Sequence, residues 1–178
     1  MSERWKPSVT VAGIIEQEGR FLLVEEETPE GLMLNNPAGH LELGESPEQA
    51  CVREVLEETT YAFTPEHLVG VYISRFQRRI QMHPTPTHAN TPRSQEIEDI
   101  TYIRFAFCGA LGACNPALKL DKGIVRTVWL TMDELRESRG LHRSPLLLAC
   151  AEDYLRGQRF SLSTVRSDAS IYAPPMRG

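Results

Sequence analysis

The hydrophobic pattern of the chain predicts β-strands separated by polar turns. Residues 9–15 and 20–25 are rich in apolar side chains, and the polar residues 16–19 between them are typical of a turn. These two stretches therefore predict an N-terminal hairpin. Further strands are predicted at 32–40, where a proline and a glycine interrupt the pattern, at 66–76 and 100–111 as two strands of one sheet, and at 124–130.

Start and stop signals predict three helices. Residues 46–49, Ser-Pro-Glu-Gln, have the capping-box pattern, in which the Ser46 hydroxyl accepts a hydrogen bond from the backbone N–H of the glutamine. A second helix is predicted over 131–140, between a capping threonine and a glycine, and a third over 144–157, from a Ser-Pro pair to a glycine. We expect the tail after residue 160 to run along the surface.

Residues 77–99 are the longest stretch without a sustained period. They contain three prolines and predict a long loop, which in a compact domain is either functional or disordered. Both interpretations stay open. Because we find no internal repeat and no linker rich in Pro, Gly or Ser, residues 1–178 are expected to form one domain.

Composition and charge argue against several classes of function. The formal net charge of −5 at pH 7 disfavours a nucleic-acid surface built on net positive charge. No apolar run approaches the ~18 residues of a membrane span, and residues 1–11 lack the apolar core of a signal peptide. The four cysteines lie far apart and suggest neither zinc nor a disulfide framework. We therefore expect a cytoplasmic protein with no nucleic-acid polymer and no membrane as partner.

The segment GHLELGESPEQACVREVLEETTY, residues 39–61, is strongly acidic. On a helix with about 100° per residue, the side chains of Glu54, Glu57 and Glu58 share an arc of about 100° on one face. Like charges at these spacings repel, and Arg53 is the only arginine or lysine in the segment. The apolar residues lie on the opposite side of the helix and are expected to face the core.

Clustered carboxylates with so little basic compensation suit a hard divalent cation. Mg²⁺, or Mn²⁺ in its place, prefers oxygen ligands and keeps waters that substrate phosphates can displace. A solvated acidic face is the alternative interpretation, although repulsion of a few tenths of a kcal/mol per pair argues against it. We expect Gly39 to let the backbone turn so that its carbonyl points at the cation, and Gly44 to bring Glu45 toward the helix.

The spacing in this segment resembles the Nudix box. Six identities stand at its fixed positions, and such a match should arise by chance at roughly one in ten million per start position. These residues are Gly39, Glu45, Arg53, Glu54, Glu57 and Glu58. From about residue 6 to about residue 162 the chain is similar to the bacterial NudJ-type phosphatases of the Nudix superfamily, and the stretch 77–99 departs from that branch. The segments that carry this resemblance are KPSVTVAGIIEQEGRFLLVEE, NNPAGHLE, Trp129 and RSPL.

The resemblance implies a fold of the α/β (α+β) class, an α/β/α sandwich with a mixed β-sheet. It also implies Mg²⁺-dependent hydrolysis of a phosphoanhydride bond in a small phosphorylated substrate, by a monomer or a homodimer. The NudJ-type branch is associated with nucleoside tri- and diphosphates and with a thiamine-precursor pyrophosphate. A pyrophosphatase for ADP-ribose, nucleotide sugars or dinucleotides is one alternative, and a nucleotide-binding module without catalysis is another.

Roles follow from the resemblance residue by residue. Glu54, Glu57 and Glu58 would hold the metal, with the carbonyl of Gly39 as a further ligand. Arg53 and Glu45 would orient these carboxylates through charge-assisted hydrogen bonds. Nudix enzymes take the general base either from the box, here the favoured Glu54, or from elsewhere, where the candidates are Glu96, Glu98 and Asp121.

Other residues are candidates for substrate contact. Arg75, Arg78 and Arg79 can bind phosphate oxygens, although solvated surface arginines are the more ordinary interpretation. The amides of Asn35 and Asn36 can bind a base or a sugar, or can simply end a strand. Asp121 is included as a further candidate for the substrate site.

Thr60 departs from the box, because the family has a glycine at this position just past the helix. Glycine there accepts a left-handed backbone that ends the helix, whereas a β-branched residue at positive φ is costly. We therefore expect Thr60 to lie in an ordinary backbone region, with the helix ending by another route.

Overall fold

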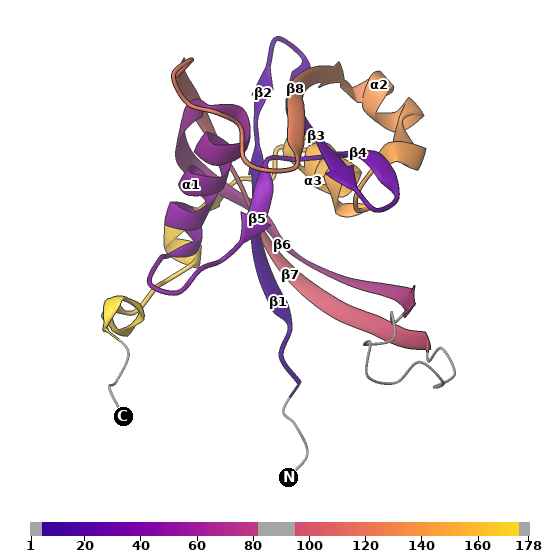
Figure 1. Cartoon of the computed structure of the whole chain (residues 1–178). Coiled ribbons are helices and arrows are strands. Elements are labelled where there is room, and N and C mark those ends of the chain that lie inside the picture. Colours follow the sequence, from indigo (N-terminus) through magenta and orange to yellow (C-terminus); the bar gives the residue numbers. More distant parts are fainter. Residues whose placement is uncertain (1–4, 82–94, 175–178) are drawn as a thin grey trace.

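The computed structural model describes residues 5–81 and 95–174, in which the strands form two sheets (Figure 1). The first sheet has the order β5-β1-β7-β6-β9, and it is mixed because β1 is parallel to β7 while the other neighbours are antiparallel. Its strands are β1 (Ser8–Ile14), β5 (Ala38–His40), β6 (Tyr61–Gln81), β7 (Gln95–Cys114) and β9 (Phe160–Ser161). In the second sheet β3 (Arg20–Thr28) pairs with β2 (Glu16–Gln17), β4 (Gly31–Asn35) and β8 (Ile124–Thr131).

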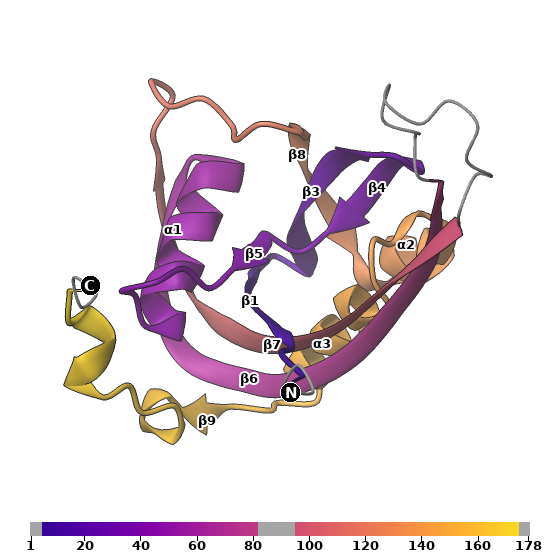
Figure 2. The ribbon, with the colours of Figure 1, turned by 60° about the horizontal axis from the view of Figure 1, so that its bottom comes forward.

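Three α-helices accompany these sheets. They are α1 (Pro47–Thr59), α2 (Met132–Glu137) and α3 (Leu146–Leu155), and short 3₁₀ turns lie at Arg139–Leu141, Leu162–Thr164 and Ala169–Tyr172. The long strands β6 and β7 run side by side as a curved pair, and the segment after α3 follows β6 (Figure 2). Within the described ranges, no helix has the length and apolarity that crossing a membrane requires.

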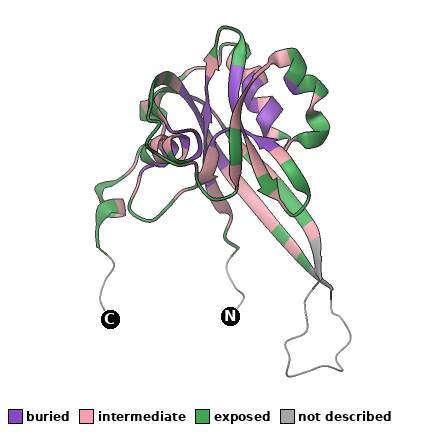
Figure 3. Ribbon diagram, turned by 45° about the horizontal axis from the view of Figure 1, so that its top comes forward, coloured by how far each residue is buried: buried purple, intermediate pink, exposed green. Residues whose placement is uncertain are grey.

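The central strand β1 packs against a different core on each face. Val11 belongs to a cluster with Val55 of α1, whereas its neighbour Ala12 belongs to a cluster with Leu147 of α3. Successive side chains of a strand point to opposite faces, so one apolar strand can supply both layers. Buried residues accordingly concentrate around the sheet between the helices (Figure 3). The predicted α/β class with a mixed sheet is confirmed.

The predicted helix starts are confirmed where a capping box was recognised. The Oγ of Ser46 accepts a hydrogen bond from the N–H of Gln49 at 3.3 Å, and the N–H of Ser46 donates to the Oε1 of Gln49 at 2.8 Å. Thr131 caps α2 in the same way with Glu134. The third helix begins two residues after Ser144, whose Oγ accepts from the N–H of Leu146 at 3.2 Å.

The predicted N-terminal hairpin is wrong in its pairing. The turn forms as expected, with Glu18 and Gly19 at φ 51° and 78°, but across this turn β3 pairs with the two residues of β2 and not with β1. Both edges of β1 are already occupied by β5 and β7, so the chain passes into the second sheet. The stretch 32–40 likewise divides into β4 and β5, which belong to different sheets.

The predicted loop over residues 77–99 is wrong at both of its ends. Residues 77–81 continue β6 and residues 95–99 begin β7, with Arg78 opposite Glu98 and Gln77 opposite Asp99. This part of the strand pair extends beyond the core, so no apolar period marks it. Cross-strand charge pairing stabilises it instead, and Arg78 and Glu98 form an ion pair. Residues 82–94 lie outside the described ranges.

The expectation for Thr60 is also wrong, because this residue has φ 62° and ψ 6° in the left-handed region. Its peptide groups are fixed from both sides, since the N–H donates to the carbonyl of Leu56 at 2.8 Å and the carbonyl accepts from Asn115 at 2.8 Å. Its Oγ1 lies 3.3 Å from the Sγ of Cys114. These bonds outweigh a strain of about 1 to 2 kcal/mol.

This geometry predicts the order of stability of two variants that both remove the threonine side chain. Thr60→Gly accepts the left-handed backbone without strain, whereas Thr60→Ala keeps the strain. We expect the free energy of unfolding in urea to be higher for the glycine variant by about 1 kcal/mol. An alanine variant of equal or greater stability would contradict the left-handed assignment, because glycine otherwise destabilises relative to alanine.

Candidate active site

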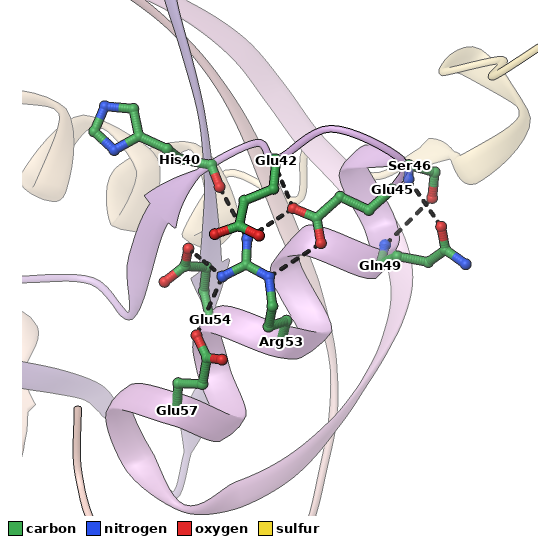
Figure 4. Close-up of polar contacts among 8 residues, drawn as sticks. All are labelled: His40, Glu42, Glu45, Ser46, Gln49, Arg53, Glu54 and Glu57. Carbon is green, nitrogen blue, oxygen red and sulfur yellow. Dashed lines mark hydrogen bonds and ion pairs between the residues drawn. The ribbon is translucent and has the colours of Figure 1, made fainter. Parts of the chain in front are cut away.

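Arg53 lies at the centre of the acidic face of α1 and uses five N–H donors there (Figure 4). Its Nε and Nη2 donate to the two carboxylate oxygens of Glu45 at 3.0 and 2.7 Å. Its Nη1 donates to Glu54 at 2.7 Å and to Glu57 at 3.1 Å, and Nη2 also donates to the carbonyl of His40 at 2.9 Å. A guanidinium has five N–H groups, so its donor capacity is filled.

These contacts do not affect the carboxylates equally. The hydrogen bond from Arg53 lowers the pKa of Glu45, because it stabilises the ionised form. Burial raises the pKa of Glu54, and the neighbouring Arg53 only partly opposes this effect. The guanidinium of Arg53 thus stabilises the negative charge of Glu45, in the loop, more fully than the negative charge of Glu54, on the helix.

Glu58 points to a different environment from Glu54 and Glu57. Its side chain lies against β5, where Oε2 accepts a hydrogen bond from the N–H of Ala38 at 2.8 Å, and the residue is only 9% exposed. Burial is the main reason that the pKa of Glu58 is raised to about 8, and the negative charges of Glu54, Glu26 and Asp121 contribute to this increase. A carboxyl in this environment favours any added positive charge.

The two glycines of the box serve different purposes. Gly44 has φ 90°, as a tight turn before Glu45 requires. Gly39 is not among the residues of positive φ; a Cβ added to it would lie 2.1 Å from the carboxyl carbon of Glu54. Its small size is therefore needed for the close approach of α1 rather than for a special backbone turn.

Within residues 5–81 and 95–174, no three His, Cys, Asp or Glu side chains form a group that could hold a metal ion as they lie. Glu54 and Glu57 are turned to Arg53, while Glu58 is turned to Ala38. The donor set nevertheless fits a hard divalent cation, because all three are carboxylates on one helix face. A cation among them would also relieve the repulsion that raises the pKa of Glu58.

A cavity of about 390 Å³ adjoins β5 on the α3 side of the sheet. Gly39 and His40 of the box form part of its wall. Arg75, Arg78 and Glu98 also line it, as does Asn35, whereas Asn36 and Asp121 are not among its lining residues.

The remaining candidates from the sequence lie as follows. Asp121 is close to α1, because its N–H donates to the carbonyl of Glu57 at 2.9 Å. Asn36 is buried and its Oδ1 has no hydrogen-bond partner among the described residues. The side chains of Arg79 and Glu96 lie outside the described part of the structure.

Sequence reasoning missed Glu26, Arg104 and Arg143, which line the same cavity. A signal existed for Arg104, which is a charged residue inside the otherwise apolar stretch 100–111. It shares a strand face with the buried Ala106, so its side chain points inward. Glu26 follows an apolar run in β3, and only the fold shows that it faces the cavity.

Comparison with known proteins agrees with this architecture. The model of the family described as NUDIX domain matches residues 4–149. Phosphatase NudJ of Escherichia coli is 33% identical over 161 residues, which are 90% of this chain and 92% of that protein. A NUDIX hydrolase from Nitrosomonas europaea is 44% identical with a TM-score of 0.74, covering 92% of this chain and 98% of that one.

The chain therefore belongs to the Nudix family and is a hydrolase of the phosphatase and pyrophosphatase kind. Nudix hydrolases act on small phosphorylated substrates and generally use divalent metals. An ADP-ribose pyrophosphatase from Streptococcus suis has a TM-score of 0.54 at 20% identity, covering 88% of this chain and 97% of that one. This last likeness shows a shared fold alone.

The raised pKa of Glu58 predicts how the stability of the metal-free protein depends on pH. The folded state binds this proton more tightly than the unfolded state, so the stabilisation is complete below the unfolded pKa and is lost as pH rises toward about 8. In the presence of a metal chelator, we expect the Tm of the wild-type protein to fall as pH rises toward about 8. The Tm of Glu58→Gln should fall less over the same pH range. Glu57→Gln is the matched control and should keep the wild-type profile; parallel profiles for wild type and Glu58→Gln would contradict the prediction.

Proposed function

We propose that the protein is a Mg²⁺-dependent Nudix hydrolase that cleaves a phosphoanhydride bond of nucleoside tri- or diphosphates, or of a related small pyrophosphate such as a thiamine precursor. One observation carries the proposal: the carboxylates of Glu45, Glu54 and Glu57 surround Arg53, and α1 adds Glu58 beside β5, where a cavity of about 390 Å³ begins. The similarity to Phosphatase NudJ of Escherichia coli supports a reaction of the phosphatase kind. A module without chemistry would not need this set of residues.

In this proposal Glu54, Glu57 and Glu58 hold the Mg²⁺, or Mn²⁺ in its place, with the carbonyl of Gly39 as a further ligand. When bound, the ion neutralises charge on the phosphates and makes an attacking water more acidic. Arg53 and Glu45 position the carboxylates, because their bidentate pair joins the loop before α1 to the helix face. The cavity beside Gly39 receives the rest of the substrate.

Glu54 is the general base in this proposal. The oxygen of water forms a bond to phosphorus, the bridging P–O bond breaks with its electron pair leaving on the departing phosphate, and the water proton passes to Glu54. Burial raises the pKa of Glu54, which increases its affinity for that proton. The carboxylate also lies against Gly39 at the wall of the cavity and on the same helix as the proposed metal ligands, whereas Glu98 lies on β7.

A panel of substrates with Mg²⁺ tests the proposal. Nucleoside tri- and diphosphates, a thiamine-precursor pyrophosphate and ADP-ribose are incubated with the enzyme, and orthophosphate, pyrophosphate and nucleoside monophosphate are assayed separately. We expect orthophosphate from the first two classes. Faster release of a nucleoside monophosphate from ADP-ribose would favour the nucleotide-sugar alternative, and the absence of any product would favour a binding module.

Removing one carboxylate charge from the cluster predicts a large loss of rate. Glu57→Gln keeps the shape of the side chain and should lower kcat by at least a hundredfold at saturating Mg²⁺, because the ion loses a charged ligand. Glu48→Gln makes the same change in the first turn of α1, away from the cluster, and serves as the control. If the Glu57 variant kept more than about a tenth of the wild-type kcat, its assignment as a metal ligand would be wrong.

A further inference from the structure

Buried polar atoms without hydrogen-bond partners are concentrated on the wall of the cavity. Across the described residues there are six such side-chain atoms, and five of them belong to Thr10, Glu26, Asn35 and Arg104, all of which line the cavity. Buried polar groups in folded proteins nearly always have partners. Several unpartnered polar groups around one cavity indicate that a bound ligand supplies their hydrogen-bond partners.

Arg104 is the least expected member of this set. The residue is only 7% exposed, yet its Nε and Nη1 have no hydrogen-bond partner in the described part of the chain. Glu26 lines the same cavity, and the opposite charges of Arg104 and Glu26 influence each other without a hydrogen bond between them. A buried guanidinium left in this state is costly, which favours a role in binding over a role in stability.

The other arginines of the cavity already have acidic partners. Arg75 pairs with Asp99, and Arg78 pairs with Glu98. Arg143 lies 3.4 Å from the Oε1 of Glu26, an ion pair without hydrogen-bond geometry. The wall is therefore not a set of free cations arranged to bind phosphate.

The unpartnered atoms include both donors and acceptors. Arg104 can only donate, whereas the carboxylate of Glu26 can only accept when it is ionised. A phosphate offers acceptors alone and would be repelled by Glu26. A nitrogen heterocycle carries both kinds of group on one planar edge, and the side chains of Phe76 and Tyr102 supply flat apolar surface in the same cavity.

We infer that Arg104 and Glu26 bind the donor and acceptor edge of a heteroaromatic ring carried by the substrate. Arg104 donates to a ring nitrogen or carbonyl, and Glu26 accepts from an amino group or ring N–H. The pyrophosphate then extends past Gly39 toward the acidic face of α1. Gly39 provides this path because it lines the cavity and also lies next to the carboxyl of Glu54. This inference rests on the proposed function and assigns to Arg104 and Glu26 the preference for substrates that carry a heteroaromatic ring over ring-free polyphosphates.

Kinetics with matched substrates test this assignment. Arg104→Met and Glu26→Gln are compared with wild type on CTP and ATP, which carry a ring, and on inorganic tripolyphosphate, which does not. We expect each variant to raise KM for at least one nucleotide about tenfold or more, with kcat little changed and tripolyphosphate unaffected. Glu25→Gln makes the same substitution at the neighbouring position of β3, where the side chain pairs with Arg126 and is not part of the cavity wall, and it should behave as wild type with every substrate.

Direct binding gives a second measurement that does not depend on hydrolysis. Calorimetry should show cytidine or adenosine binding to wild type and to Glu25→Gln, and at least tenfold weaker binding to Arg104→Met and Glu26→Gln. Thermal unfolding checks the fold, and Arg104→Met should have a Tm no lower than wild type because it removes a buried, unpartnered charge.

The outcomes separate the inference from the proposed function. An equal loss for nucleotides and tripolyphosphate would overturn the inference, because Arg104 would then serve the phosphates or the box. Unchanged nucleotide KM values, or wild-type protein that hydrolyses nucleotides but binds no nucleoside, would overturn it as well. Nucleoside binding that the variants lose, in a wild type that hydrolyses nothing, would support the inference and overturn the proposed function.

Discussion

The repulsion among the carboxylates of α1 is the constraint on which the site depends. Glu45, Glu54 and Glu57 meet around the single guanidinium of Arg53, which also binds the carbonyl of His40 at the end of β5. Because these partners come from a strand, a loop and a helix, one side chain fixes the path of the chain from β5 into α1. Glu58 is left outside this network and retains a raised pKa. The carboxyl that Arg53 does not contact is therefore the one that a cation can stabilise most.

Two close contacts determine where that cluster lies relative to the sheet. A Cβ on Gly13 of β1 would lie 2.6 Å from a methyl of Val55, and a Cβ on Gly39 of β5 would overlap the carboxyl of Glu54. Glycine at both positions lets the helix approach the two strands closely. The apolar side of α1 meets the core through Val55, while its acidic side reaches the edge of β5. Strand β5 thus both borders the cavity and contacts the carboxyl groups of Glu54 and Glu58.

Features set by local contacts could be predicted from the sequence, and features set by distant contacts could not. The capping box at Ser46 involves two residues that are three positions apart, so the local pattern is sufficient to predict it. The partner of β1 depends on which strands occupy its edges, which no local pattern contains. Thr60 adopts a disfavoured backbone because its carbonyl bonds to Asn115, far along the chain. Arg104 and Glu26 converge only when β7 and β3 are folded around one cavity.

The acidic cluster and the cavity are coupled through their buried charges. Burial lowers the pKa of the Arg104 guanidinium, and nearby acidic groups, among them Glu26 and to a smaller extent Glu58, only partly oppose this effect. A cation held by Glu58 would replace the proton on this carboxyl and would add positive charge near the guanidinium of Arg104. Its unpartnered N–H groups would then gain more from an acceptor on a ligand than they gain in the metal-free protein. Coupling of this kind is reciprocal, so a ligand that satisfies Arg104 would also favour the cation at Glu58.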